Sequence, residues 1–204
     1  MKRFSRKGGR NGRFLTLPNL LTLLRLLLIP PILLALLYRS FKVAFALYAL
    51  AATTDWVDGY LARRIRQTSR LGLILDPIAD KLLSFVSLVA LTVPSLGYSN
   101  PLPLWFTVLI LFRDIFLLVG IIILYSMIRR ISIKVHALGK ASTFFEDVSL
   151  FLVFLLNALN RPAPLLFVLY IITLALALLS LEGYVRYALK EARHRAKNKH
   201  VQRP

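Results

Sequence analysis

The chain has 204 residues, of which 57% are hydrophobic, and its mean hydropathy of +0.67 is too high for an ordinary soluble domain, so one integral membrane domain is expected. It contains no cysteine, which excludes disulfides and thiolate chemistry. The net charge of +18 would suit a nucleic-acid-binding protein, but the basic residues lie beside hydrophobic stretches, a pattern that indicates membrane topology and attraction to anionic lipids, with no nucleic acid partner.

Six hydrophobic segments follow one another along the chain. Each is close to the roughly 20 residues that a helix needs to cross a bilayer. They predict an all-α fold, an integral membrane bundle of six transmembrane helices at 17–188, between a basic N-terminal segment at 1–16 and a basic tail at 189–204. The segments are 17–38, 42–62, 73–95, 102–128, 141–160 and 163–187.

The distribution of Lys and Arg predicts which side of the membrane each connection occupies. With both termini in the cytoplasm, the cytoplasmic segments hold 21 basic residues, as 6, 4, 4 and 7 in 1–13, 63–72, 129–140 and 186–203. The opposite side holds three, which are Arg39, Lys42 and Arg161. This asymmetry favours six spans with both ends in the cytoplasm.

Four aspartates fall within 26 residues in and beside the second and third predicted spans, although the whole chain has nine acidic residues. Charged groups in a membrane segment are costly and usually functional. Carboxylates this close repel one another unless protons or cations neutralise them. Clustered oxygen ligands favour a hard divalent ion, so we expect Mg²⁺ or Mn²⁺. The four are Asp55, Asp58, Asp76 and Asp80.

The spacing of the aspartates places them together. Asp55 and Asp58 are three residues apart, and Asp76 and Asp80 are four apart, so each pair shares a helix face. Asp55 and Asp80 each lie eight residues from the basic loop between them, which is a depth of about 12 Å. Antiparallel packing therefore predicts a metal site at the cytoplasmic end, near the lipid headgroups. Two ions there could bridge a diphosphate, and one aspartate could accept a proton from an alcohol.

Small residues flank the aspartates. Gly59 and Gly72, and more mildly Ala62, leave room for a large group to approach the backbone. Close packing of helices is the alternative explanation for the glycines alone. Beside four aspartates, the binding interpretation is favoured.

Arg113 lies within the fourth predicted span and has two interpretations. Its guanidinium could grip the phosphate of an acceptor in a bidentate manner. Alternatively, it pairs internally with Asp114, Glu146 or Asp147. Glu146 and Asp147 are themselves expected to pair with a basic residue on a neighbouring span.

Two further cations are candidates for binding the acceptor. Lys140 lies at the cytoplasmic start of the fifth predicted span, where an ammonium group could serve a phosphate. Arg25 lies too deep in the first span for a free surface charge, so we expect it to have a partner or a ligand.

The complete string from Asp55 to Asp80, Asp-x2-Asp-Gly-x2-Ala-Arg-x8-Gly-x3-Asp-x3-Asp, resembles the signature of the CDP-alcohol phosphotransferase family. The resemblance implies a membrane enzyme that transfers a substituted phosphate from a CDP-linked donor to an alcohol and releases CMP. It also implies a homodimer.

The same resemblance assigns roles to the residues of the motif. Three aspartates would bind metal, and Asp80 would be the general base while also contacting the second of two ions. The metal ligands would be Asp55, Asp58, Asp76 and Asp80, and the donor site would comprise Asp58, Gly59, Ala62, Arg63 and Gly72.

Segments 17–25 and 76–81 are similar to those of phosphatidylglycerophosphate synthases and cardiolipin synthases, and segment 139–143 resembles an element of phosphatidylglycerophosphate synthases. We therefore expect a bacterial inner-membrane enzyme, its active site facing the cytoplasm, that moves the phosphatidyl group of CDP-diacylglycerol to glycerol-3-phosphate. The sequence Phe112-Arg113-Asp114 is more like cardiolipin synthases, whose acceptor is phosphatidylglycerol, and other acceptors are further alternatives. A divalent metal transporter is the alternative from a different class, since buried carboxylates also line ion paths.

Overall fold

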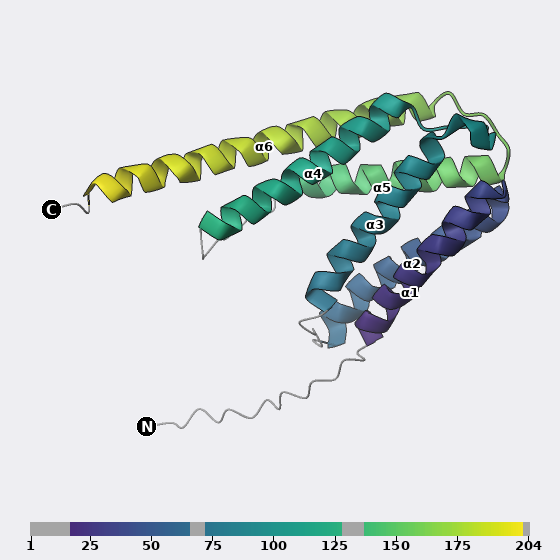
Figure 1. The fold of residues 1–204 in the computed structure, drawn as a ribbon, viewed down its shortest axis with the longest axis horizontal. Helices are drawn as coiled ribbons and strands as arrows, with labels where there is room; N and C mark the ends of the chain where they lie inside the picture. Colours follow the sequence, from purple (N-terminus) through teal and green to yellow (C-terminus); the bar gives the residue numbers. More distant parts are fainter. Residues whose placement is uncertain (1–16, 66–71, 128–136, 202–204) are drawn as a thin grey trace, which may run out of the picture.

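The fold was examined in a computed structural model (Figure 1), which describes residues 17–65, 72–127 and 137–201, with side chains at 20–54, 75, 78–120 and 138–186. Within these ranges the chain forms six α-helices and one short 3-10 helix, and it forms no strand. The all-α prediction is therefore confirmed. The elements are α1 (Leu17–Leu37), α2 (Phe41–Ile65), α3 (Gly72–Thr92), η1 (Pro94–Leu96), α4 (Leu104–Met127), α5 (Ala137–Ala158) and α6 (Leu166–Val201).

Three of these helices are long and apolar enough to cross a membrane, judged on the described residues. Their apolar stretches are Leu20–Leu37, Leu138–Ala158 and Leu166–Arg186. Many large apolar side chains point outward, among them Leu27, which is 63% exposed, and Phe112, which is 60% exposed. An apolar exterior of this extent suits contact with lipid rather than water.

Successive helices run in alternating directions, and the connections 38–40, 93–103 and 159–165 gather at one end (Figure 1). At the other end the helices spread apart, with the ends of α1, α2 and α3 separated from those of α4 and α6. α1 packs on α2 and α3, α4 packs on α6, and α5 packs on both α2 and α6. The packing of α5 on α2 thus joins the two groups of helices.

Aromatic side chains fill the interior between these helices. Tyr48 of α2 stacks on Phe154 of α5, with ring centroids 4.2 Å apart. Phe106 of α4 lies against Tyr170 of α6 at 4.8 Å. All four residues are buried, so these contacts add apolar burial and favourable ring geometry to the packing of the helices.

Two buried asparagines join the connections at the closed end of the bundle. The backbone N–H of Asn100 donates to Oδ1 of Asn157 at 2.9 Å, and Nδ2 of Asn157 donates to the carbonyl of Asn100 at 3.1 Å. The Asn100 side chain donates to the carbonyl of Arg161 and accepts from the N–H of Ala163, both at 2.8 Å. These bonds satisfy irregular backbone that would otherwise be buried without partners.

α1 and α5 end in the same way, with one residue in the left-handed conformation. Arg39 has φ 57° and Asn160 has φ 52°. After α1, the N–H of Ser40 donates to the carbonyl of Ala35, and that of Arg39 donates to Leu36. This is a Schellman motif, which normally uses glycine at that position. The Arg39 guanidinium also donates to the Ser95 carbonyl at 3.0 Å, which ties the first connection to the second.

Replacing Asn157 with alanine should destabilise the bundle, because the N–H and carbonyl of Asn100 lose their partners. Leaving buried polar groups unsatisfied costs about 1–3 kcal/mol. We expect a lower midpoint of thermal unfolding in detergent. Asn160→Gly is the control in the same connection. Glycine accepts the left-handed conformation and only the exposed hydrogen bond from Ser99 Oγ to Asn160 Oδ1 is lost, so the midpoint should stay close to that of the wild type. Equal midpoints for the two variants would show that the asparagine bonds do not stabilise the fold.

Candidate active site

The helices that carry the four aspartates are consecutive and adjoin the same loop. Asp55 and Asp58 lie in the last part of α2, and Asp76 and Asp80 lie in the first part of α3. α1 packs on both helices. The backbone therefore places both pairs toward the open end, where the motif predicts them.

Most of the motif's side chains lie outside the described residues. Those of Asp55, Asp58, Gly59, Ala62, Arg63, Gly72 and Asp76 belong to this group. Asp80 is described and is partly buried. How the four carboxylates are arranged together therefore stays a prediction, and so does the donor site. Both predictions rest on the spacing of the motif along two described helices.

Asp80 lies near a buried tyrosine of the bundle. Tyr48, 4% exposed, lies on α2 seven residues before Asp55, which is about two helical turns. The Tyr48 hydroxyl lies within electrostatic range of Asp147, Asp80 and Glu146. Carboxylates from α3 and α5 thus approach one point of α2.

A cavity of about 840 Å³ opens between α3, α4, α5 and α6. Part of its wall is apolar, with Ile78, Leu82 and Phe85 from α3. Its cationic lining residues are Lys81, Arg113 and Lys140. Oxygen-bearing side chains in the lining are Asp114, Thr143, Asp147 and Tyr184. A cavity with three cations and an apolar wall can hold an anionic group attached to either a small polar molecule or a lipid.

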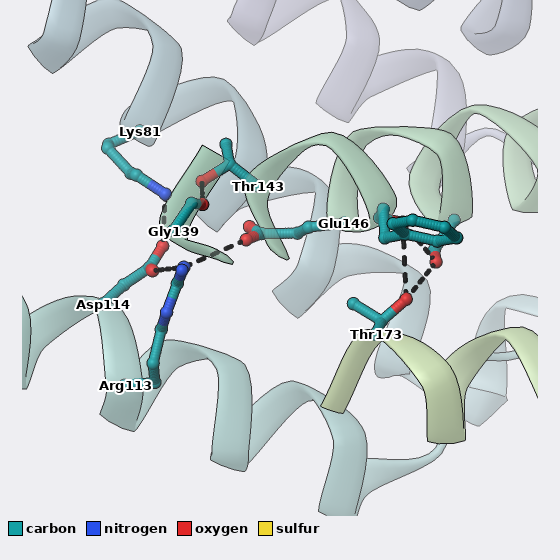
Figure 2. A network of polar contacts seen from close by, with 9 residues as sticks. Lys81, Arg113, Asp114, Gly139, Thr143, Glu146 and Thr173 are labelled. Atoms are coloured by element: carbon teal, nitrogen blue, oxygen red, sulfur yellow. Dashed lines mark hydrogen bonds and ion pairs between the residues drawn. The ribbon is translucent and has the colours of Figure 1, made fainter. Parts of the chain in front are cut away.

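Charged residues of three helices form a chain beside this cavity, which Figure 2 shows. Nζ of Lys81 lies 2.6 Å from Oδ2 of Asp114, and Nη1 of Arg113 lies 2.7 Å from Oδ1 of the same carboxylate. Nη1 of Arg113 is also 3.7 Å from Oε2 of Glu146. Positive and negative groups therefore alternate from α3 through α4 to α5.

The structure shows the internal pairing that was one of the two interpretations of Arg113. It also confirms that Glu146 pairs with a basic residue on a neighbouring helix. These ion pairs do not use all the donors of Arg113, because a guanidinium has five N–H groups and Nε has no hydrogen-bond partner among the described residues. Arg113 can therefore hold its carboxylates and still offer donors to a ligand.

The three predicted acceptor cations divide between two places. Arg113 and Lys140 line the cavity, whereas Arg25 is not among its lining residues. Arg25 is 1% exposed on α1, the helix that packs on α2 and α3. α1 begins at Leu17 and α3 begins at Gly72, so Arg25 and Asp80 each lie eight residues after the start of their helix. That is about 12 Å along each helix. Arg25 thus belongs to the side of the bundle that carries the aspartates.

Sequence reasoning did not identify three contributors to this region. Lys81 stood out only as a cation within a span, yet it joins α3 to α4 through Asp114. A basic residue in an apolar stretch was the available signal, since such residues seek partners. Tyr48 and Tyr184 gave no signal, because tyrosine is common in membrane helices.

The donor set fits a divalent metal, although its full geometry lies outside the described side chains. Among the side chains that the structure describes, no three potential metal ligands cluster. The motif nevertheless supplies four carboxylates on two adjoining helices, and such oxygen-only sets suit hard ions. That Asp80 is one of these ligands stays a prediction of the motif.

Comparison with known proteins agrees with this picture. The pattern describing the CDP-alcohol phosphatidyltransferase family matches residues 15–181. A CDP-diacylglycerol–glycerol-3-phosphate 3-phosphatidyltransferase of Aquifex aeolicus is 39% identical over 178 residues, which cover 86% of this chain and 96% of that protein. A probable phosphatidylglycerophosphate synthase of Mycobacterium tuberculosis is 40% identical over 146 residues, 68% of this chain and 66% of the relative.

A third relative has a different product in its name. The cardiolipin synthase (CMP-forming) of Streptomyces coelicolor is 40% identical over 144 residues, which cover 66% of this chain and 63% of that protein. All three relatives and the matching pattern agree on one class of enzyme. The chain belongs to the CDP-alcohol phosphatidyltransferase family.

Proposed function

We propose that this protein transfers the phosphatidyl group of CDP-diacylglycerol to glycerol-3-phosphate and releases CMP, which is the activity of phosphatidylglycerophosphate synthase. The observation that carries this proposal is the complete aspartate motif on α2 and α3, with Asp80 partly buried, together with a cavity lined by cations. The similarity over 96% of the Aquifex relative supports glycerol-3-phosphate as acceptor.

We further propose six membrane spans with both termini and the active site on the cytoplasmic side of a bacterial inner membrane. The excess of basic residues in the segments predicted to be cytoplasmic, 1–13, 63–72, 129–140 and 186–203, supports this orientation. The basic segments 1–16 and 189–204 would contact anionic lipids there. As in the family, the functional unit would be a homodimer.

Asp55, Asp58, Asp76 and Asp80 would hold two divalent ions, Mg²⁺ or Mn²⁺. Bound there, the ions would neutralise the diphosphate of the donor and stabilise the charge that develops on it. Gly59, Ala62 and Gly72 would leave room for the CDP group along the helix backbones. Arg63 would add a positive charge near its phosphates.

The acceptor would enter from the cavity. Arg113 and Lys140 would bind its phosphate, and Arg25 would add positive charge from the aspartate side. Asp80 would accept the proton of the attacking hydroxyl. The hydroxyl oxygen would then form a bond to the β-phosphorus of the donor, and the bond to CMP would break, so that CMP leaves with the bonding electron pair.

Phosphatidylglycerol is the second candidate acceptor, which would make the product cardiolipin. The apolar wall formed by Ile78, Leu82 and Phe85 is compatible with the acyl chains of a lipid acceptor. The Streptomyces relative carries that activity in its name. Both acceptors present a phosphate and a free hydroxyl, so the same cations and base would serve either one.

The choice of acceptor can be tested with purified protein, CDP-diacylglycerol and Mg²⁺. Glycerol-3-phosphate and phosphatidylglycerol would be offered separately, with inositol phosphate and serine as further acceptors, and CMP release would be measured. We expect release with glycerol-3-phosphate. Release with phosphatidylglycerol alone would replace the proposed acceptor, and the absence of release with any acceptor would favour a metal transporter.

Asp80→Asn should abolish measurable turnover, since loss of a general base typically costs a factor of about 10² to 10⁴. Binding of labelled CDP-diacylglycerol should stay within about tenfold of wild type, because three aspartates remain as metal ligands. Glu182→Gln, which removes an exposed carboxylate paired with Arg186 on α6, is the control and should keep full turnover. Turnover of Asp80→Asn at the wild-type rate would exclude Asp80 as the base.

Removal of divalent cations with EDTA should reduce CMP release by about 10² or more, because the donor's diphosphate charge is then not neutralised. Added Mg²⁺ or Mn²⁺ should restore it, and Ca²⁺, which prefers more ligands in a looser shell, should restore less. The rate of CMP release against free metal concentration is the measurement. Full activity in excess EDTA would contradict the metal assignment.

A further inference from the structure

Glu146 on α5 is a buried carboxylate that the proposed reaction does not use. It is 1% exposed, and neither carboxylate oxygen has a hydrogen-bond partner among the described residues. Burying a carboxylate is unfavourable unless an opposite charge compensates it. Arg113 supplies that charge, with Nη1 at 3.7 Å from Oε2. The contact joins α5 to α4 beside the cavity (Figure 2).

The Arg113 guanidinium lies between two carboxylates from different helices. Asp114, its neighbour on α4, contacts Nη1 at 2.7 Å and also holds Lys81 of α3 at 2.6 Å. Asp114 alone would leave the guanidinium tied only to its own helix and to α3. Glu146 attracts it from α5. A planar guanidinium between two fixed anions has fewer orientations than one with a single partner.

The face of α5 next to Glu146 carries the other cation of the acceptor site. Lys140, Thr143 and Asp147 line the cavity, and their spacings of three and four place them on one helix face. Glu146 is not among the lining residues. It therefore acts on Arg113 from behind the cavity wall and draws the guanidinium toward the helix that carries Lys140.

We propose that Glu146 is a positioning residue for the acceptor's phosphate: it orients Arg113 so that its unused N–H donors and Lys140 serve the same anion. The proposal rests on the proposed function, because it assigns Arg113 and Lys140 to the acceptor. Glu146 touches neither substrate, so its effect passes through Arg113. The donor, which the aspartate motif holds, is not affected.

Glu146→Gln tests this role, since glutamine has nearly the same shape but no charge. We expect the KM for glycerol-3-phosphate to rise by about fivefold or more, the KM for CDP-diacylglycerol to stay within about twofold, and kcat to change by less than about threefold. A purely structural role would reduce the amount of folded enzyme and so lower kcat with both KM values unchanged. An unchanged KM for glycerol-3-phosphate, or an equal rise in both KM values, would overturn the proposal.

Two further variants keep the test decisive. Glu146→Asp retains the charge but withdraws it by one methylene, so we expect a smaller rise in the KM for the acceptor. If Glu146→Gln does not fold, Glu146→Asp alone tests the proposal, and an unchanged KM for the acceptor in that variant would reject it. In the background of Arg113→Lys, which lacks the planar fork, Glu146→Gln should cause no further rise. If Glu146→Gln raised the KM for the acceptor as much in the Arg113→Lys background as in the wild type, Glu146 would act by a route other than Arg113. Glu182→Gln is the matched carboxylate control with unchanged constants.

The wild-type enzyme separates the failure of this inference from that of the proposed function. If the wild-type enzyme turns over glycerol-3-phosphate and Glu146→Gln has the wild-type KM for it, the role of Glu146 is overturned and the proposed function is left intact. Turnover with phosphatidylglycerol alone would overturn the proposed acceptor. A rise in the KM for that lipid in Glu146→Gln would then still support the positioning of Arg113.

Discussion

Charge neutralisation inside an apolar bundle is the constraint on which this structure depends. Arg113 and Glu146 are almost fully buried. Asp114 and Glu146 supply the negative charge that compensates Arg113, and Arg113 supplies the positive charge that compensates Glu146. Lys81 extends the same chain of charges to α3. The aspartates of the motif on α2 and α3 all carry negative charge, so they too need to be neutralised, and divalent cations from the solvent are the expected source of the opposite charge.

The two ends of the bundle are built differently. At one end, short connections are joined by reciprocal bonds between Asn100 and Asn157 and by the bond from Arg39 to Ser95. At the other end the helices diverge. The ion-paired residues Lys81, Arg113 and Asp114 line the cavity between α3, α4, α5 and α6. This division separates the residues that stabilise the fold from those that are available to substrates.

Much of the helical architecture could be predicted from sequence, because apolar runs of about 20 residues have few alternatives. The motif from Asp55 to Asp80 was readable for the same reason, since helix periodicity alone places its pairs on shared faces. The chain from Lys81 to Glu146 could not be predicted in full, because it depends on how α3, α4 and α5 rotate against one another. Sequence left Arg113 with three possible partners, and only packing selects Asp114 and Glu146. The separation of Arg25 from the cavity likewise follows from which helices α1 packs on.

The asparagine junction has a mechanical consequence for the distant cavity. Because the helices are fastened at one end, each behaves as a lever arm whose pivot lies near Asn100 and Asn157. α4 has 24 residues. A helix of that length spans about 36 Å, so a tilt of about 5° at the pivot moves its free end by about 3 Å. Small angular adjustments among a few amide groups at the closed end of the bundle can thus change the width of the cavity between α3, α4, α5 and α6.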